Sequence, residues 1–540
     1  MSNDKKHVYG IDLGTTYSAI SYVNEFGKAE IIKNSAGGST TPSVVYFETA
    51  NNIVVGEDAK DAGNASKEDA ARVVDSVKRQ MSNTVYTFEA FGKEYDPVAV
   101  SALILKKMVN DAKEAGHDVQ DVVITCPAYF GELERTRTRQ AGEAIGLNVL
   151  EIIDEPVAAA LNYGLEKPDV KGKNVIVYDL GGGTFDVTVI SIGSDPNRDE
   201  IRVICTEGDH LLGGKDWDDR IVQYYLDQFE EKTGRDIRQA DPEETHGIMY
   251  DLQTAAEKNK KTLSNRESVS QKVSFEGKDV KVELSRGQFE EMTTALFDRT
   301  ATLTDRLLEL AKEKGIAKID AFLLVGGSTK MPQIAKKIEE KYGASLGIKP
   351  ESFDPDEAVS KGAGKNGQIA MIRNMGAEGK SDKEISIATG VAIEGIEKAK
   401  KTVLVKVATK TYGIGVVNDE VSNLIFKQSE VPFEITETYY AVSTTDTLAM
   451  SFWASDEEKM KNISRGRATL LVEKPFYLGQ TVPGGTPVGI TVKLSQEGKL
   501  SLYAVVAGST PFELEFVVEG ARDEQEMNDL KKELANKSTT

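Results

Sequence analysis

Two short stretches of the chain place an aspartate directly before a glycine turn, between segments rich in strand-forming residues. They are "YGIDLGTTYSAISYV", which contains Asp12, and "VYDLGGGTFDVTVI", which contains Asp179, 167 residues further along (179 − 12 = 167). Glycine adopts positive φ and lets a phosphate approach the backbone closely, so such a turn can direct several N–H groups at an anion. The first turn offers Asp12, Gly14, Thr15 and Thr16, and the second offers Asp179, Gly181, Gly182, Gly183, Thr184 and Asp186.

A single turn of this type is a plain hairpin at least as often as a phosphate site. Two copies in matching strand contexts favour phosphate binding, because chance seldom repeats the whole pattern. The repeat predicts two similar α/β halves that face one another across a nucleotide. We expect Asp12 and Asp179 to be directed at one Mg²⁺ ion through water.

Two further motifs carry weaker signals. In "AFLLVGGSTKMPQIAKKIEEKY" a strand passes through Gly326 and Gly327 into a helix capped by Ser328 or Thr329, which suits a phosphate or a base edge but also plain helix capping. After two phosphate turns, it becomes a candidate third wall of the site. In "TAAEKNKKTLS" the residues Glu257, Lys260, Lys261 and Ser264 share one helix face, and spacing alone favours a solvated face with internal ion pairs.

The elements that must position these residues follow from the periodicity. Up to about residue 375, strand-like runs alternate with helical patterns such as 99–116, 133–146 and 215–232, which is typical of an α/β architecture. From about 405 to 520, short apolar runs broken by turn residues predict a β-sandwich. Between them, "TVLVKV" at 402–407 fits an interdomain linker and an edge strand about equally well. The last stretch predicts a charged helical tail.

Composition excludes several classes of protein. With 540 residues the chain should hold two to four domains, and its net charge of −20 disfavours nucleic-acid binding. Two cysteines, Cys126 and Cys205, indicate a reducing compartment. Four histidines without metal-ligand spacing argue against a transition-metal site. The sequence has no signal-peptide pattern and no apolar run of about 20 residues, so we expect a cytoplasmic protein without a membrane partner.

At this point the motifs resemble a known family, the seventy-kilodalton heat-shock chaperones of DnaK type. The matching strings, in order from residue 8 to about 365, are "GIDLGTTYS", "ITCPAYFGELER", "GLNVLEIIDEPVAAALNYGL", "VYDLGGGTFDVTV", "LGGKDWDDRIV", "AAEKNKKTLS", "LLVGGSTKMP" and "DPDEAV". The resemblance implies an α/β actin-like ATPase with two duplicated lobes at 1–380, a linker region at 381–409 and a mainly-β sandwich at 410–522 that binds peptides. The short charged tail is then 523–540.

The resemblance also implies roles for single residues. Lys78, Glu155, Asp179 and Thr184 would be catalytic, and Asp12 and Asp179 would hold Mg²⁺ and K⁺. ATP would contact Gly14, Thr15, Thr16, Gly181, Gly182, Gly183, Thr184, Gly213, Gly214, Glu257, Lys260, Lys261, Ser264, Gly326, Gly327, Ser328, Lys330 and Asp356. Pro127, Arg135, Glu151, Leu404 and Lys406 would report the nucleotide state to the linker. Leu424, Ile425 and Phe426 are candidates for the peptide groove, although each suits the sandwich core equally well.

The chain departs from the family pattern at several positions. Lys330 stands where the family has an arginine that stacks on adenine, and His210 is displaced by one position. Lys406 in the linker and Glu151 before the catalytic glutamate both reverse the usual charge. We hypothesise that these two residues meet when the linker docks, as an exposed pair worth about 0–1 kcal/mol. The reversal puts stimulation by ordinary J-domain cochaperones in doubt.

Only about 20 residues follow the β region, so we expect the helical lid of the family to be missing. The resemblance predicts an ATP-dependent chaperone that binds apolar polypeptide segments, with a J-domain cochaperone and a nucleotide-exchange factor as partners. ATP would favour docked domains and fast peptide exchange. The alternative is an ATP-sensing regulatory cochaperone with little hydrolysis, which the missing lid and altered linker favour.

Overall fold

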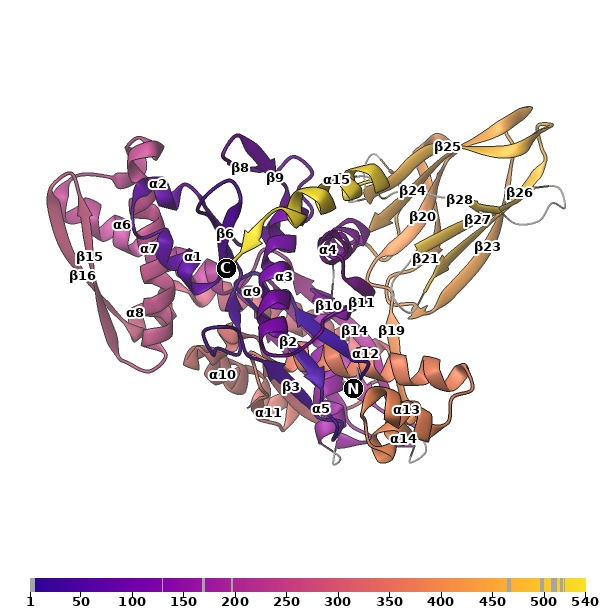
Figure 1. Cartoon of the computed structure of the whole chain (residues 1–540), viewed down its shortest axis with the longest axis horizontal. Helices are drawn as coiled ribbons and strands as arrows, with labels where there is room; N and C mark the ends of the chain where they lie inside the picture. The colour runs from indigo at the N-terminus through magenta and orange to yellow at the C-terminus, as the bar shows by residue number, and fades with distance from the viewer. Residues whose placement is uncertain are drawn as a thin grey trace.

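The structure is a computed structural model that describes residues 5–128, 130–167, 170–195, 198–463, 468–495, 500–506, 512–514, 518 and 520–540. Figure 1 shows two α/β lobes, an elongated β-sandwich beside them, and a helix that returns from the sandwich to the lobes. The helical patterns predicted at 99–116, 133–146 and 215–232 are confirmed by α3 Pro97–Glu114, α4 Glu132–Ala144 and α6 Gly214–Thr233.

The first lobe (lobe I, residues 5–154) is built on a sheet with the strand order β11-β10-β1-β2-β3. β1 and β2 form an antiparallel hairpin around the first glycine turn, while β10 runs parallel to β1 and to β11. Helices cover both faces of this sheet, which is why β1 and β10 are almost wholly apolar. The strands are β1 Val8–Asp12, β2 Tyr17–Val23, β3 Ala29–Ile32, β10 Asp121–Cys126 and β11 Asn148–Asp154.

The second lobe (lobe II, residues 174–352) repeats this arrangement. Its sheet begins with the order β18-β17-β12-β13-β14, in which β12 and β13 form the hairpin around the second glycine turn and β17 runs parallel to β12. The predicted duplication is therefore confirmed strand by strand. The strands are β12 Asn174–Leu180, β13 Phe185–Ile192, β14 Asp199–Asp209, β17 Ala321–Val325 and β18 Pro350–Ser352.

Two helices join the lobes. They are α5 Glu155–Glu166 and α12 Ala358–Ala377, which pack against each other. α12 also packs against β1, β2 and β10 of lobe I, and α5 packs against β12 and β13 of lobe II. Smaller elements extend both lobes. Lobe I adds α1 Glu57–Ala62, α2 Lys67–Ala70, β5 Val44–Phe47, β6 Asn52–Val55, β7 Val73–Asp75, β8 Phe88–Ala90 and β9 Lys93–Tyr95; lobe II adds α7 Pro242–Leu263, β15 Ser268–Phe275, β16 Lys278–Ser285, α8 Arg286–Met292, α9 Thr294–Glu313 and α10 Pro332–Ile338.

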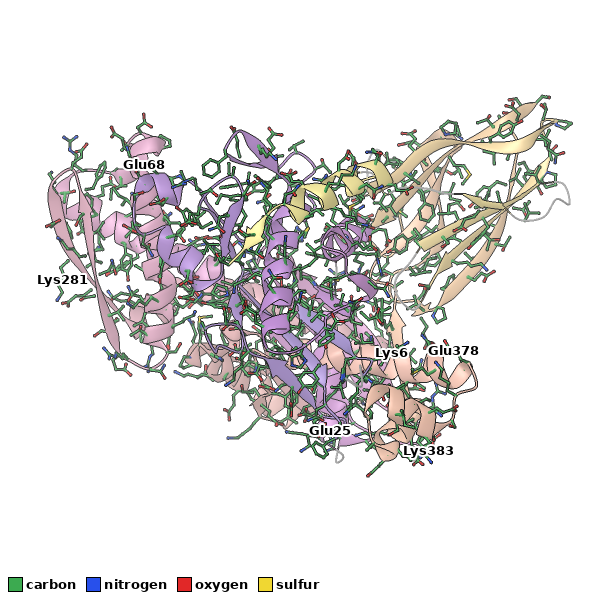
Figure 2. All side chains as sticks on the ribbon, viewed as in Figure 1. Lys6, Glu25, Glu68, Lys281, Glu378 and Lys383 are labelled. Carbon is green, nitrogen blue, oxygen red and sulfur yellow. The ribbon has the colours of Figure 1, made fainter. Side chains whose placement is uncertain are left out.

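The segment predicted as a linker region has regular structure. α13 Asp382–Thr389 and α14 Ile393–Lys401 pack with α12 around their own small apolar cluster. Figure 2 shows Glu25, Glu378 and Lys383 at the outer surface of this corner. The following strand, β19 Thr402–Val407, pairs in parallel with β14 of lobe II and antiparallel with β22 Glu430–Val431. Residues 402–407 thus extend the lobe II sheet and lead directly into the sandwich.

The β-sandwich consists of two four-stranded sheets, β21-β20-β24-β25 and β23-β26-β27-β28. Its apolar core includes Leu424 and Ile425, which are 1% and 0% exposed, whereas Phe426 is 44% exposed. Of the three candidates for the peptide groove, only Phe426 presents its side chain to solvent. The strands are β20 Thr411–Val416, β21 Glu420–Ile425, β23 Phe433–Tyr440, β24 Thr445–Ser455, β25 Ala468–Val482, β26 Pro487–Leu494, β27 Leu500–Val506 and β28 Phe512–Leu514.

The predicted charged tail forms α15 Glu524–Ala535 and a short strand, β29 Ser538–Thr539. Figure 1 shows α15 running from the sandwich over α4 toward β6 of lobe I. Among the described helices, none combines the length and the apolar character needed to cross a membrane.

Candidate functional site

The two glycine turns interlock across the space between the lobes. A Cβ atom on Gly182 would lie 1.5 Å from Oγ1 of Thr16, and one on Gly183 would lie 2.5 Å from Oγ1 of Thr15. Real Cβ atoms do not approach other atoms so closely, so only glycine fits at these two positions. The turns predicted from the sequence to face each other do so, with the threonines of lobe I packed on the glycines of lobe II.

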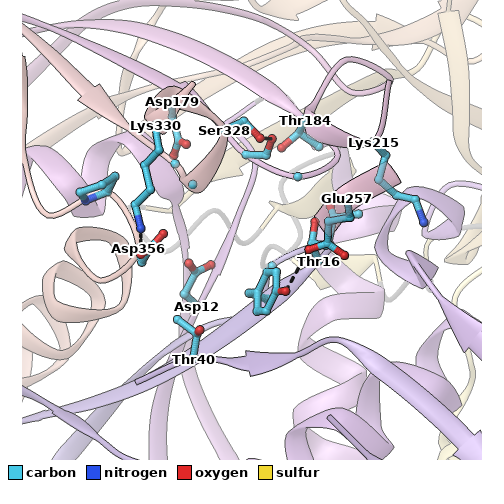
Figure 3. Close-up of a pocket in the computed structure, with 18 of the residues that line it drawn as sticks. Asp12, Thr16, Thr40, Asp179, Thr184, Lys215, Glu257, Ser328, Lys330 and Asp356 are labelled. Carbon is cyan, nitrogen blue, oxygen red and sulfur yellow. Dashed lines mark hydrogen bonds and ion pairs between the residues drawn. The ribbon is translucent and has the colours of Figure 1, made fainter. Parts of the chain in front are cut away.

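A cavity of about 540 Å³ lies beside these turns. Figure 3 shows Asp12 and Asp179 directed into it, with Lys330 and Asp356 at one end and Thr16 and Glu257 at another. Most of the predicted site residues line this cavity: Asp12, Gly14, Thr15, Thr16, Lys78, Glu155, Asp179, Gly181, Gly182, Thr184, Glu257, Lys260, Lys261, Ser264, Gly326, Gly327, Ser328, Lys330 and Asp356.

Three predicted glycines, Gly183, Gly213 and Gly214, do not line the cavity themselves but pack against the turns that do. Gly214 donates its N–H to the carbonyl of Gly181 (2.9 Å). Gly213 packs closely on Gly183, because a Cβ added to Gly213 would lie 2.5 Å from the backbone nitrogen of Gly183. The start of α6 therefore fixes the shape of the second turn. The third turn does the same from the other side, because Ser328 Oγ donates to the carbonyl of Gly181 (2.8 Å).

Carboxylates dominate the floor of the cavity. Burial and the nearby Glu155 raise the pKa of Asp12 to about 7, and burial with the charges of Glu155 and Asp12 raises the pKa of Asp179 well above its usual value. Asp186 behaves in the same way because it is buried close to Glu155. Burial and, to a smaller extent, repulsion between the acids disfavour their ionised forms, so the site favours the arrival of positive charge.

One lysine lies among these acids. Lys78, on a short 3-10 helix at Val77–Gln80, is 4% exposed and forms an ion pair with Glu155 at the start of α5. Burial alone would lower the pKa of Lys78, but the charges of Glu155 and Asp12 raise it. Lys78 is therefore a fixed positive charge at the wall of the cavity, where a developing negative charge on a phosphoryl group could be stabilised.

The helix face at the far side of the cavity is not simply solvated. Glu257 and Lys260 are 9% and 8% exposed, so the solvated face favoured by spacing alone is wrong for these two residues. Glu257 pairs with Lys60 of lobe I and with Lys261. Burial alone would raise the pKa of Glu257, but these two lysines lower it to about 2. Tyr17 completes the bridge by donating to Glu257 (2.9 Å).

Lys260 points the other way, donating to the carbonyl of Gly214 (2.8 Å) and pairing with Asp218 (2.9 Å). Lys330 forms an ion pair with Asp356 at the rim. The sequence reasoning missed other lining residues, among them Tyr17, Thr40, Lys215, Asp218, Asn265 and Met331. Of these, Tyr17, Lys215, Asn265 and Met331 could have been found, since each directly follows a predicted residue; Thr40 and Asp218 do not.

The predicted contact between Glu151 and Lys406 is present, because Lys406 of β19 forms an ion pair with Glu151 of β11. The expectation that this pair is exposed was wrong: Glu151 is 9% and Lys406 6% exposed, and Asn366 donates to the second carboxylate oxygen of Glu151 (2.7 Å). Leu404 of the same strand is buried in the apolar core between the lobes.

Arg135 lies beside this pair. It forms an ion pair with Asp154 and donates to the carbonyls of Phe130 (2.9 Å) and of Ala128 (3.1 Å), the residue after Pro127. A small cavity between lobe I and the sandwich is lined by Arg135, Glu132, Lys406 and Tyr412 of β20. Of the predicted switch residues, Arg135 and Lys406 line this cavity, Glu151 pairs with Lys406, and Leu404 lies apart in the core between the lobes.

The residues of the large cavity fit a magnesium nucleotide. The hydroxyl oxygen of Thr16 is buried without a hydrogen-bond partner in the described structure, which suits a phosphate or a metal-bound water. Within the described residues, no three His, Cys, Asp or Glu side chains gather closely enough to hold a metal by themselves. A hard cation here would need phosphate and water as further ligands, as Mg²⁺ usually does.

Comparison with known proteins shows to which family the chain belongs. Residues 8–462 match the family model described as Hsp70 protein. The chain belongs to the Hsp70 family. It is 37% identical over 446 residues to the chaperone protein DnaK of Thermosipho africanus, covering 81% of this chain and 68% of that protein. It is 34% identical over 542 residues to the DnaK of Thermosipho melanesiensis, covering 98% and 83%, and 35% identical over 520 residues to that of Thermotoga petrophila, covering 94% and 80%.

Membership of the Hsp70 family confirms the expected fold, an actin-like ATPase followed by a β-sandwich, and the expected class of activity, an ATP-dependent chaperone with ATPase activity. Binding of ATP and ADP and of polypeptide substrates belongs to that class.

Proposed function

We propose that this Hsp70 protein hydrolyses ATP in the cavity between its lobes with Lys78, Glu155, Asp179 and Thr184 as the catalytic residues. The observation that carries the proposal is the meeting of the two glycine turns over buried carboxylates, with the Lys78–Glu155 pair at the wall of the same cavity. The glycine turns would hold the phosphates by their N–H groups, and residues of α7 and the third turn would hold the adenosine.

Asp12 and Asp179 would hold Mg²⁺ through water, and K⁺ would lie near the same carboxylates. The metal ion would supply charge neutralisation for the phosphates when bound. Glu155 would orient a water molecule and accept its proton, while Lys78 and the Thr184 hydroxyl, which line the same cavity, would stabilise the transferred phosphoryl group. Positioning and electrostatics of this kind supply most of the rate in phosphoryl transfer.

We propose that residues 1–380 bind ATP, that residues 410–522 bind apolar peptide segments, with Phe426 as a contact, and that residues 381–409 couple them. The buried Glu151–Lys406 pair and the Arg135–Asp154 pair support coupling, because they lie between the cavity floor and the sandwich. A J-domain cochaperone and a nucleotide-exchange factor would act on this cycle. Two buried free thiols, Cys126 and Cys205, support a cytoplasmic location.

Single-turnover ATP hydrolysis tests the catalytic assignment. Lys78→Ala and Thr184→Ala should each slow hydrolysis by about 100-fold or more, the usual cost of removing one group that stabilises a transition state. Lys67→Ala is a matched control, because the Lys67 side chain is 60% exposed on lobe I and outside the cavity. Equal rates for all four proteins would support the less favoured alternative, an ATP sensor with little hydrolysis.

A further inference from the structure

The segment from residue 520 to 540 leaves the sandwich and binds along lobe I. Its helix α15 buries Met527, Leu530 and Leu534, which are 8%, 4% and 1% exposed, in the same apolar core as the side chains of α3 and α4. Figure 1 shows this helix lying across α4 and ending beside β6. The segment is therefore part of the lobe I core and not a loose appendage of the sandwich. We call residues 520–540 the strap.

The end of the strap adds a strand to a lobe I sheet. β29 pairs in parallel with β6, so that the sheet order is β29-β6-β5-β7. The N–H of Ser538 donates to Asn51 (2.9 Å), that of Thr540 to Ile53 (3.0 Å), and the N–H of Val55 donates to the carbonyl of Thr540 (2.9 Å). Strand addition to an open sheet edge is a common way for proteins to bind an extended peptide.

A pocket next to this edge holds a lysine. The side chain of Lys537 is 2% exposed, and its Nζ donates to the carbonyl of Ala50 (2.5 Å) and to the hydroxyl of Tyr95 (2.9 Å). Lys106 of α3 donates to the carbonyls of Leu534 and Lys537 (both 2.6 Å). A buried lysine whose ammonium is hydrogen-bonded to a carbonyl and a hydroxyl of lobe I has the character of a binding anchor.

The beginning of the strap is also fixed to lobe I. Arg137 of α4, which is 4% exposed, donates to the carbonyl of Gly520 through Nε (3.0 Å) and Nη2 (2.6 Å). Arg522 pairs with Asp96 (3.1 Å), the residue that caps α3. The sandwich is thus attached at both of its ends, to lobe II through β19 and to lobe I through the strap.

We propose that lobe I carries a peptide-docking site, made by the edge of β6 and the Lys537 pocket, and that residues 536–540 of this chain occupy it. Through this site the strap holds the β-sandwich against lobe I. The strap limits how far the two can separate, whichever nucleotide is bound. The consequence for peptide release rests on the proposed ATP cycle, but the docking site and the tether do not.

Hydrogen exchange of the full chain without nucleotide tests both parts. Lys537→Met keeps an apolar stem but removes the buried ammonium, so exchange at Val55 and Thr540 should become about tenfold faster, and exchange across residues 402–412 should rise as the sandwich loosens. Lys532→Met is the matched control, because the Lys532 side chain is 76% exposed on the same helix. Unchanged exchange at Val55 would overturn the docking site. Faster exchange at Val55 without change at 402–412 would overturn the tether.

A second experiment keeps the native residues of 522–540, so it does not depend on the stability of the Lys537→Met protein. A protease site inserted between Ala521 and Arg522 is cut after folding. The fragment 522–540 should remain bound through gel filtration at micromolar concentration, and a synthetic peptide of the same residues should exchange with it, whereas the Lys537→Met peptide should not. Loss of the fragment on the column, or equal competition by both peptides, would refute the site. Because no nucleotide is present, failure of the ATP cycle would leave these results unchanged.

Discussion

The cleft between the two lobes and the interface between lobe I and the sandwich are both built from buried charges, but they are balanced differently. In the cleft, Asp12 and Asp179 lie near Glu155, which pairs with Lys78, and mainly burial raises the pKa values of Asp12, Asp179 and the neighbouring Asp186. At the sandwich interface Glu151 pairs with Lys406, Arg135 with Asp154, and Arg522 with Asp96, while burial raises the pKa of Glu132 to about 7.

The difference indicates how each region responds to a ligand. A cleft with buried carboxylates gains most stability when a metal ion brings positive charge close to them and phosphates fill the glycine turns. An interface whose charges are already paired is complete without a ligand, so its opening must be driven by changes elsewhere. We infer that nucleotide binding orders the cleft, whereas docking of the sandwich is the resting arrangement.

The largest effect is expected in the cleft, at Gly182. A Cβ at this position would collide with Thr16, so Gly182→Ala should push the two turns apart and abolish ATP binding. Isothermal titration with ATP and Mg²⁺ measures this loss. Docking of the sandwich should persist, because none of its charge pairs involves the turn.

Gly287→Ala on α8 is the control for this variant, since no atom lies within 4 Å of a Cβ there and the residue does not line the cavity. Normal ATP affinity in Gly182→Ala would mean that the turns can separate freely. Close packing of the two turns would then not be what holds the cleft together, and in this respect the cleft would not differ from the interface as we infer.

The second largest effect is expected at the interface with the sandwich, at Glu151 and Lys406. Removing one member of a buried ion pair leaves the other charge without compensation, so Glu151→Ala and Lys406→Ala should each cost about 3–5 kcal/mol of unfolding free energy. The exchanged pair Glu151→Lys with Lys406→Glu should recover most of this loss, because Asn366 can turn its amide to offer an oxygen to the new lysine. Urea unfolding measures the first effect, and the ATP-dependent fluorescence of Trp453 in a Trp217→Phe background follows docking.

If the exchanged pair behaved as poorly as the single variants, the two charges would not act as a pair. If the single variants unfolded like the wild type, the interface would be held by apolar contacts alone. Either result would remove the distinction drawn between the two regions.

The same two regions show what could be predicted from the sequence. The cleft residues could be predicted because two aspartate–glycine turns occur in matching strand contexts, so Asp12, Gly182 and Thr184 could be placed without a structure. The Glu151–Lys406 contact was predictable from two matched charge reversals. Its burial was not, because burial depends on Asn366 and on β19 joining the lobe II sheet, and no local pattern shows that pairing.

The strap and the peptide groove lay beyond local patterns for a related reason. The charged sequence of α15 indicates a solvated helix, yet Leu530 and Leu534 lie on one face and fill a groove whose other wall comes from α3 and α4, more than 380 residues earlier. In the sandwich, alternating strands have apolar residues on both core and surface positions, so the sequence could not separate buried Leu424 from exposed Phe426.

The smallest effect is expected from pH at the sandwich interface. Glu132, at the start of α4, faces Arg135, Arg139 and Glu134 on its own helix and Tyr412 of the sandwich; burial raises the pKa of Glu132 from 4.5 to about 7, although the arginines oppose the shift. In the docked state Glu132 keeps its proton up to about pH 7, whereas the exposed carboxyl loses its proton near pH 4.5. Protonation therefore favours docking, and docking becomes stronger as the pH falls from 7. Docking should therefore be about tenfold weaker at pH 8 than at pH 6, or about 1.4 kcal/mol.

The Trp453 signal measured between pH 6 and pH 8 checks this expectation, and Glu132→Gln should make the docking equilibrium independent of pH in this range, because its amide does not titrate. Glu143→Gln, on the same helix but away from the interface cavity, should keep the wild-type profile. A profile that survives in Glu132→Gln would assign the pH dependence to another group. In the cleft, by contrast, the Glu257 bridge to Lys60 should stay constant over this range, since the pKa of Glu257 is lowered to about 2.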